Sequence, residues 1–234
     1  MDMNDMGSAI PSWLTTVSWI FLGLAAVSAG FLLYDIYGRG YRQRLRAMEV
    51  VWVTTALYLG PLAVLAYSRW GRPRSEKWQD EHCDAPEKSL PVAAATGGLT
   101  GGAASALAHV VGVPLVVLSG LTIAGLDLWA MILVIAVMAT ALLFAFEYFF
   151  STVRERGLPS GQGLGVALLI ALITVLAFDV GMGGWMLFLH FSAFMPAPTD
   201  VAFLFLMQIG LFLGFLTGYP AVAWLVGRGT KATV

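Results

Sequence analysis

Long apolar runs without lysine or arginine constrain this chain more than any other feature. The longest stretch free of both residue types covers 71 residues, from 157 to 227. A transmembrane helix needs about 20 apolar residues to cross the hydrocarbon core of a bilayer. Runs of this length without polar alternation indicate helices rather than barrel strands, because in lipid the backbone must satisfy its own hydrogen bonds. We therefore expect an integral membrane protein that has the lipid bilayer as its main partner.

Composition agrees with this class. Of the 234 residues, 59% are hydrophobic and 12% are charged, and the mean hydropathy is +0.80. Soluble domains average about 25% charged residues. The net charge of −1 argues against a nucleic-acid partner, because no basic patch is available to neutralise phosphates. A single cysteine, Cys83, excludes an intramolecular disulfide and a Cys-x-x-Cys site. No nucleotide-binding or hydrolase motif is present, so an enzyme is not expected.

The apolar runs predict an all-α, polytopic transmembrane helical bundle of about six spans, which forms a single integral membrane domain over residues 1–234. The first eight residues carry Asp2 and Asp5 but no basic residue, so the first run is predicted to be a retained anchor rather than a cleaved signal. Residues 71–91 are expected to form one polar loop between spans. The candidate spans are 12–37, 47–69, 92–119, 127–152, 164–194 and 201–227.

The arrangement of basic residues leaves the number of spans and the orientation open. With six spans, four arginines between 39 and 46 lie on one side of the membrane, and the other nine basic residues lie opposite. The positive-inside rule then places both termini inside. If 47–69 only dips into the membrane, five crossings remain and all thirteen basic residues share one side. Glu49 and Pro61 within that segment favour this second arrangement.

The fifth run holds the most specific pattern of chemically active side chains. Asp179, Met182, Met186 and His190 fall within an arc of about 80° on one helix. Thioether sulfur and imidazole nitrogen are ligands that suit Cu(I). The sequence therefore predicts that these residues bind a metal, with copper favoured. The alternative is that the methionines are flexible core residues and that His190 is hydrogen-bonded near a membrane interface.

Asp179 carries most of the functional interpretation. It lies near the middle of an apolar run, where an isolated carboxylate is costly and tends to face a pathway or a partner. No lysine or arginine lies in the interior of any predicted span. We therefore expect the partner of Asp179 to be a histidine, a hydroxyl, a backbone group, water or an ion.

The third run is rich in small residues, which predicts close helix packing. Gly97 with Gly101, and Gly98 with Gly102, form two overlapping small-xxx-small pairs. His109 follows on a neighbouring turn and is a further candidate metal ligand, although a hydrogen bond across helices explains it equally well.

Other polar residues have simpler interpretations. Glu147 at the end of the fourth run is expected to reach the headgroups, and Gln208 is expected to hydrogen-bond between helices. Asp35 and Glu49 flank the arginine-rich segment and are expected to pair with it. In the polar loop, His82 and Cys83 lie among acidic residues, a segment interpreted as a solvated acidic loop rather than a metal site.

Two segments carry a family resemblance. Residues 51–72, VWVTTALYLGPLAVLAYSRWGR, are similar to a bacterial membrane family catalogued as domain of unknown function 4396. Residues 179–231 resemble the same family through DVGMGGWM and LMQIGLFLGFLTGYPAVAWLVGRGTK. The similarity covers residues 47–231. It implies a helical fold embedded in a bacterial cell inner membrane, for a family whose function is not established.

The chain departs from this family at one place. The family typically has a His-Cys…Cys motif followed by Gly-Asp at the start of its central helix, which resembles a metal site. Here residues 100–105 hold no cysteine, and His109 stands where the family has the acid. The resemblance therefore implies that any such metal site has been lost or rebuilt around His109.

Three functions fit these observations. The first is a membrane protein that binds or conducts a cation, with a copper ion favoured over alkali ions. The second is a non-catalytic subunit or assembly factor of a larger membrane complex, or a homo-oligomer. The third is a redox protein in which His109 and His190 hold a haem.

Overall fold

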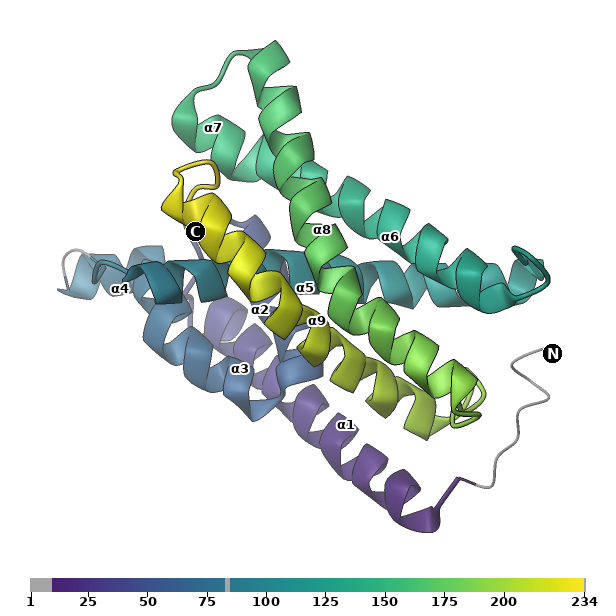
Figure 1. Cartoon of the computed structure of the whole chain (residues 1–234). Helices are drawn as coiled ribbons and strands as arrows, with labels where there is room; N and C mark the ends of the chain where they lie inside the picture. The colour runs from purple at the N-terminus through teal and green to yellow at the C-terminus, as the bar shows by residue number, and fades with distance from the viewer. Residues whose placement is uncertain (1–9, 83–84, 234) are drawn as a thin grey trace.

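The computed structural model describes residues 10–82 and 85–233, and within these ranges it consists of helices and short connections (Figure 1). Three of the helices, α1, α3 and α6, end in a π-helical turn. The α-helices are α1 (Ser12–Leu33), α2 (Ala47–Leu59), α3 (Pro61–Ala66), α4 (Glu76–His82), α5 (Leu90–Ser119), α6 (Asp127–Ala145), α7 (Thr152–Arg156), α8 (Ser160–Phe191) and α9 (Val201–Gly227). The short turns are η2 (Tyr34–Gly38), η3 (Tyr67–Gly71), η4 (Arg72–Arg74) and η5 (Phe146–Phe150).

Five of these helical segments are long and apolar enough to cross a membrane, which confirms the predicted all-α membrane bundle. They are Ser12–Gly38, Leu90–Ser119, Asp127–Arg156, Ser160–Phe191 and Val201–Gly227. The last four of these segments are joined by short connections and run in alternating directions across the bundle, whereas residues 39–89 separate the first two (Figure 1). The chain is therefore a multi-pass membrane protein.

The remaining apolar segment, 47–71, forms a helical hairpin that returns to the side from which it starts. The 13-residue helix α2 is about 20 Å long, shorter than the hydrocarbon core. It ends at Gly60, whose φ of 55° and ψ of −131° suit glycine, and Pro61 then begins α3. The two ends of the hairpin meet, because the amide of Glu76 donates a hydrogen bond of 3.1 Å to the carbonyl of Arg42. This is the shallow arrangement that the sequence left open.

Because the hairpin returns, all thirteen lysines and arginines lie at one end of the bundle, which we call the basic end. The connections at the opposite end, residues 120–126 and 192–200, contain no lysine or arginine. That end carries Asp127 and Asp200, and Asp200 caps α9 by accepting a hydrogen bond of 2.8 Å from the amide of Ala202. Charge is therefore strongly asymmetric along the axis of the bundle.

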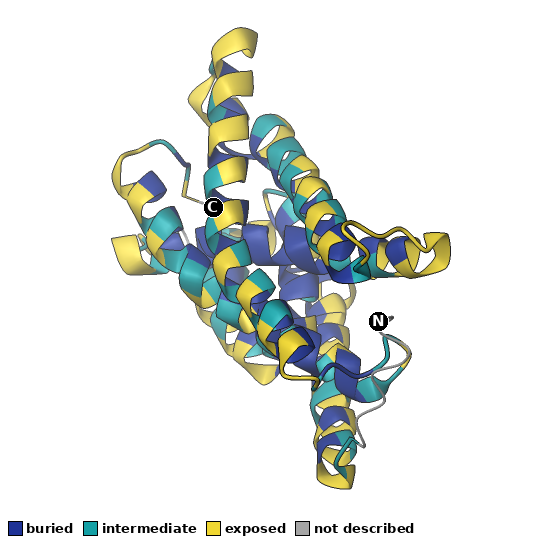
Figure 2. Cartoon of the chain, turned by 45° about the vertical axis from the view of Figure 1, so that its right-hand side comes forward, coloured by how far each residue is buried: buried dark blue, intermediate teal, exposed yellow. Residues whose placement is uncertain are grey.

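The glycine-rich helix α5 runs through the centre of the bundle and is buried along most of its first half (Figure 2). Its four predicted packing glycines face different neighbours. A Cβ at Gly97 would meet Lys231 and Val222, and one at Gly98 would meet Phe215, each at 3.2–3.3 Å. One at Gly101 would meet Thr174 at 2.8 Å, and one at Gly102 would meet the Tyr58 hydroxyl. Their small size lets α2, α8 and α9 approach the backbone of α5.

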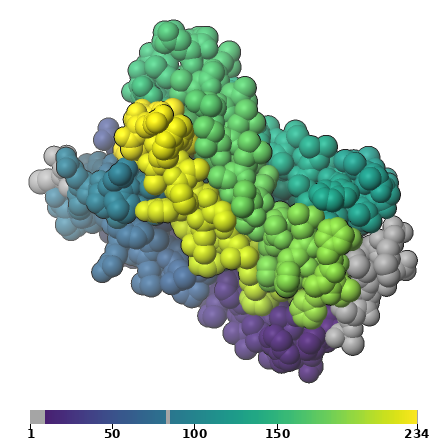
Figure 3. Space-filling view, in the orientation of Figure 1, coloured from purple at the N-terminus to yellow at the C-terminus, as the bar shows by residue number. Residues whose placement is uncertain are grey.

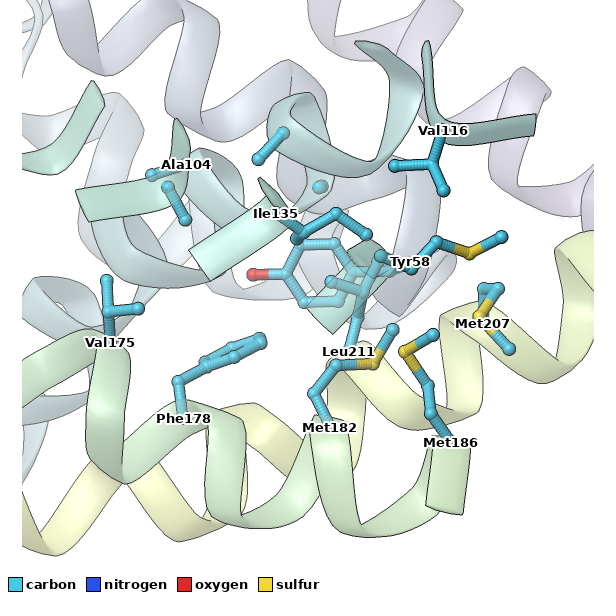
Figure 4. Packing of buried hydrophobic residues seen from close by; sticks show 14 of the residues in the cluster. Tyr58, Ala104, Val116, Ile135, Val175, Phe178, Met182, Met186, Met207 and Leu211 are labelled. Atoms are coloured by element: carbon cyan, nitrogen blue, oxygen red, sulfur yellow. The ribbon is translucent and has the colours of Figure 1, made fainter. Parts of the chain in front are cut away.

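The apolar core has two main parts. The larger cluster gathers buried residues of α5, α6, α8 and α9 around Tyr58 (Figure 4). The smaller cluster joins α1, α2 and α3 around Trp52 and Tyr67, whose rings meet edge to face at 5.6 Å. The space-filling view shows the C-terminal segment seated between α8 and the blue segments of the basic end (Figure 3). The larger cluster contains the predicted metal-binding stripe.

Candidate functional site

Two members of the predicted stripe, Met182 and Met186, point into the larger core cluster. Both side chains are buried, and Figure 4 shows their thioethers on the same side of α8, facing Met207 of α9. The close approach of α9 depends on Gly210, because a Cβ there would meet the sulfur of Met182. Helical spacing identifies Met182 and Met186 as candidate ligands. It does not identify Met207, because this residue lies on another helix and shares no spacing pattern with them.

Methionines are concentrated in this cluster. Of the seven methionines in the described ranges, six belong to it or pack against it, and the seventh, Met48, lies in the smaller cluster. The six come from α6, α8, α9 and the connection between α8 and α9. They are Met131, Met138, Met182, Met186, Met195 and Met207. Most of them lie in the half of the bundle opposite the basic end.

His190 lies one turn beyond Met186, near the last turn of α8. The side chain is only 9% exposed, and within the part of the chain that the structure describes its Nδ1 atom has no hydrogen-bond partner. The ring meets Phe191 edge to face at 5.2 Å. A buried imidazole nitrogen without a partner is available as a ligand or as a hydrogen-bonding group.

Asp179 does not join the methionines. It is half-buried and lines a cavity of about 610 Å³ between α6 and α8, whose other walls are almost entirely apolar. Among residues 10–82 and 85–233 its carboxylate makes no hydrogen bond or ion pair. We call this cavity the α6–α8 groove; it is lined by Ala136, Val137, Thr140, Ala141, Phe144, Leu164, Gly165, Leu168, Leu172, Val175, Leu176 and Asp179. The predicted stripe is thus divided between the core and this groove.

His109 makes its hydrogen bond within its own helix, α5. Its Nδ1 atom lies 2.8 Å from the carbonyl oxygen of Ser105 on the same helix, and its buried Nε2 atom has no partner among the described residues. No group of three His, Cys, Asp or Glu side chains able to hold a metal occurs in the described ranges. His109 and His190 share no ring contact or hydrogen bond there, and their role as haem ligands stays a prediction.

One buried pair of opposite charges was not predicted from the sequence. The side chains of Glu147 and Lys231 are both 0% exposed and form an ion pair. The second carboxylate oxygen of Glu147 accepts a hydrogen bond of 2.6 Å from Thr152, and Lys231 also donates to Thr100 at 3.4 Å. The expectation that Glu147 reaches the headgroups is therefore wrong, because the C-terminal segment folds back and supplies a buried cation.

Lys231 enters the bundle beside the glycines of α5. Its aliphatic stem lies against Gly97, where a Cβ would approach the Cε atom at 3.2 Å. Lys231 follows the last predicted span, so a cation reaches the interior of the bundle although no span contains one. The only sequence signal was that the resemblance to the membrane family continued past the last apolar residue as far as Lys231.

The predictions for Asp35, Glu49 and Gln208 are confirmed. Asp35 pairs with Arg39 at 2.8 Å, and Glu49 pairs with Arg42 at 2.8 Å, as expected for acids flanking the arginine-rich segment. The Gln208 amide donates a hydrogen bond of 2.7 Å to the carbonyl of Leu57, which confirms its predicted role between helices. Cys83 lies outside the described residues, and the exposed His82 stacks on Trp78 at 4.5 Å.

Comparison with known proteins gives a family but no close relative. No curated protein and no solved structure matches the chain. A family model described as "Domain of unknown function (DUF4396)" matches residues 92–231. The match begins in the first turn of α5 and ends at Lys231, so it contains the resemblance at 179–231 but not the one at 51–72. Because the matched region covers more than half of the chain and includes α5, α6, α8, α9 and the buried Glu147–Lys231 pair, the protein belongs to this family.

Proposed function

We propose that this protein binds a soft monovalent cation, Cu(I), in the methionine-rich half of its transmembrane bundle. The observation that carries the proposal is the convergence of Met182, Met186 and Met207 from two helices into one buried cluster (Figure 4). Thioethers are soft, uncharged donors that suit Cu(I), whereas hard cations require several oxygen ligands. His190 supports the proposal because its buried Nδ1 atom lacks a partner in the described ranges.

The distribution of charge favours binding over conduction through the bundle. A cation crossing the whole bundle would have to leave among the basic residues, which all lie at one end. Their charge raises an electrostatic barrier there. We therefore propose that the ion enters and leaves at the opposite end, where His190 and the acidic residues Asp127 and Asp200 lie.

The same asymmetry suggests an orientation. The positive-inside rule places the basic end in the cytoplasm. With five crossings, the N-terminus then lies on the outer side and the C-terminus on the cytoplasmic side. We propose a bacterial inner membrane as the location, so the methionine-rich half would face the periplasm.

A Cu(I) competition titration tests the assignment. The purified protein in neutral detergent would be titrated with Cu(I) under anaerobic, reducing conditions against a coloured Cu(I) chelator. We expect about one Cu(I) per chain for the wild type. A Met182→Leu, Met186→Leu, Met207→Leu variant keeps the volume of the core and should bind about tenfold more weakly or not at all.

Met48→Leu is the matched control, because Met48 is equally buried but belongs to the smaller cluster. It should bind Cu(I) like the wild type. A wild-type protein that does not compete with the chelator would overturn the proposal. Equal binding by the triple variant would overturn the ligand assignment.

The α6–α8 groove favours a second function, as a non-catalytic subunit of a membrane complex. Its apolar walls and its single carboxylate, Asp179, match a partner helix that carries a basic or hydroxyl side chain at the same depth. Asp179→Asn should then abolish co-purification of a stoichiometric partner from native membranes. Glu81→Gln, which changes an exposed acid far from the groove, should retain the partner. Purification of the wild type without any partner would count against this function.

A further inference from the structure

The arginines of the basic end fall into two groups: those whose side chains have a partner among the described residues, and those whose side chains have none. Arg39 and Arg72 lie beside Asp35, and Arg42 and Arg46 hydrogen-bond to Glu49. Arg156 donates to the carbonyl of Thr230, and Arg228 lies over the ring of Trp224. Within the part of the chain that is described, the side chains of four others make no hydrogen bond, ion pair or aromatic contact: Arg44, Arg69, Arg74 and Arg154.

All four of these arginines line two adjoining cavities. The larger cavity, of about 500 Å³, is lined by Arg44, Arg74 and Arg154 together with Lys88. The smaller, of about 380 Å³, is lined by Arg69 and shares Trp70, Arg74 and Lys88 with the larger one. We call the two cavities together the arginine pocket. Its cations come from four separate parts of the fold: the segment after α1, the η3–η4 turns, the segment just before α5, and α7.

The described residues that line the arginine pocket carry more positive than negative charge. Four arginines and Lys88 line the two cavities, against two carboxylates, Glu155 in the larger cavity and Glu87 in the smaller. Burial, and then the neighbouring charge of Arg74, lowers the pKa of Lys88 to about 8. Cations brought together from different elements repel one another, so an anion bound among them would relieve this repulsion.

The lining and its depth indicate what kind of anion would fit. Besides the cations, the larger cavity is lined by Trp52, Trp70 and Phe150, with Leu45 and Met48 beside them. Tryptophan is typical of the membrane–water interface, where headgroups and the first acyl carbons meet. The pocket therefore combines guanidinium groups, which bind phosphate oxygens in pairs, with an apolar wall at headgroup depth.

We propose that the arginine pocket binds the phosphate group of an anionic phospholipid from the leaflet at the basic end. Arg44, Arg74 and Arg154 would hold the phosphate, and the tryptophans would pack against the glycerol and upper acyl chain. Basic pockets between transmembrane helices are known to hold anionic headgroups. This inference does not depend on the proposed Cu(I) site, which lies in the other half of the bundle.

Lipid titration in detergent tests the proposal. Short-chain phosphatidylglycerol would be added to the purified full-length protein in neutral detergent, and binding followed by native mass spectrometry and by tryptophan fluorescence. Short-chain phosphatidylcholine and inorganic phosphate serve as separate arms. We expect phosphatidylglycerol to bind about tenfold more tightly than phosphatidylcholine. Inorganic phosphate should compete only weakly, because it lacks the acyl chain.

A pair of triple variants separates the pocket from general surface charge. Arg44→Gln, Arg74→Gln, Arg154→Gln should lose about tenfold in affinity for phosphatidylglycerol. Lys77→Gln, Arg156→Gln, Arg228→Gln removes the same charge from the same end but outside both cavities, and it should bind within about twofold of the wild type. If the first variant does not fold, the single changes Arg44→Gln and Arg154→Gln, both at exposed side chains, should each weaken binding about threefold.

Three results would overturn the proposal. One is equal affinity of the wild type for phosphatidylglycerol and phosphatidylcholine. Another is an equal loss of affinity in the two triple variants, which would indicate a diffuse surface effect. The third is tight binding of inorganic phosphate with no response to phosphatidylglycerol, which would assign the pocket to a soluble anion.

Discussion

At the basic end, each of the buried acids Asp35, Glu49 and Glu147 contacts a lysine or arginine. In the methionine-rich half, Asp179 and His190 have no side-chain hydrogen bond within the described residues. The first arrangement fixes the fold, because a buried charge is tolerated only when it is paired and hydrogen-bonded. The second leaves groups that a ligand or partner can still satisfy. Whether a buried polar residue has a structural or a functional role can therefore be judged only when its partners in the fold are known.

Breaking the Glu147–Lys231 pair should give the largest effect. Glu147→Gln leaves the ammonium of Lys231 buried without a counter-charge, so we expect the unfolding free energy to fall by about 3–5 kcal/mol. Glu147→Leu with Lys231→Met removes both charges and should recover most of the loss. Unfolding in mixed detergent micelles, followed by circular dichroism, measures both. Equal stability of Glu147→Gln and the wild type would show that the pair is not formed.

Adding a methyl group at Gly181, where α8 packs against α9, should give the next largest effect. A Cβ there would approach the carbonyl carbon of Leu213 at 2.6 Å and the Thr217 hydroxyl at 2.7 Å. Because backbone atoms of α9 cannot move aside, Gly181→Ala should destabilise by about 1–3 kcal/mol.

The neighbouring Gly183 is a matched control on the same helix, since a Cβ there meets nothing within 4 Å. Gly183→Ala should be neutral or stabilising by up to about 1 kcal/mol, because alanine favours the helix. Thermal unfolding of both variants in the same detergent measures the difference in stability between them. A loss of stability of the same size in both would rule out a specific α8–α9 contact.

Two aspartates compare the regions directly. Asp35→Asn removes the charge that pairs with Arg39 and Arg72, and should destabilise by about 1 kcal/mol, a small value because Arg39 is partly exposed. Asp179→Asn removes a carboxylate without a cation beside it, and should leave stability unchanged or slightly increased. Chemical unfolding measures the difference between them. A larger loss for Asp179→Asn would mean that this carboxylate has a structural partner.

Much of the fold could be predicted from the sequence, because membrane spans depend on local composition. The five long helices follow from apolar runs whose length matches the bilayer. The hairpin at 47–71 was harder, since its hydrophobicity resembles a span. Its return depends on Gly60 and on contacts between residues 42 and 76, which are far apart in sequence. Glu49 and Pro61 were the local signals in favour of it.

The candidate sites were less predictable, because they depend on contacts between helices. Helical spacing placed Met182, Met186 and Asp179 on one face, whereas the structure places the two methionines in the larger core cluster and Asp179 at the α6–α8 groove. A ligand set that includes Asp179 stays a prediction. Spacing fixes angles on one helix and says nothing about which neighbour each angle meets. Met207 and Lys231 join their clusters from other segments, so no pattern within a single run could have found them.

The smallest expected effect is a pH dependence of lipid binding at the basic end. Because burial lowers the pKa of Lys88 from the ordinary 10.5 to about 8, the free protein carries this ammonium below that pH and loses it as the pH rises. A phosphodiester bound beside it favours the protonated form, so binding takes up a proton above about pH 8. Affinity for phosphatidylglycerol should therefore be constant below pH 7 and fall about threefold by pH 9. The arginines keep their charge over this range, so Lys88→Met should bind slightly more weakly at pH 7 and show no change with pH. A wild-type affinity that does not change between pH 7 and pH 9 would place Lys88 outside the contact with the headgroup and would restrict the arginine pocket to its guanidinium groups.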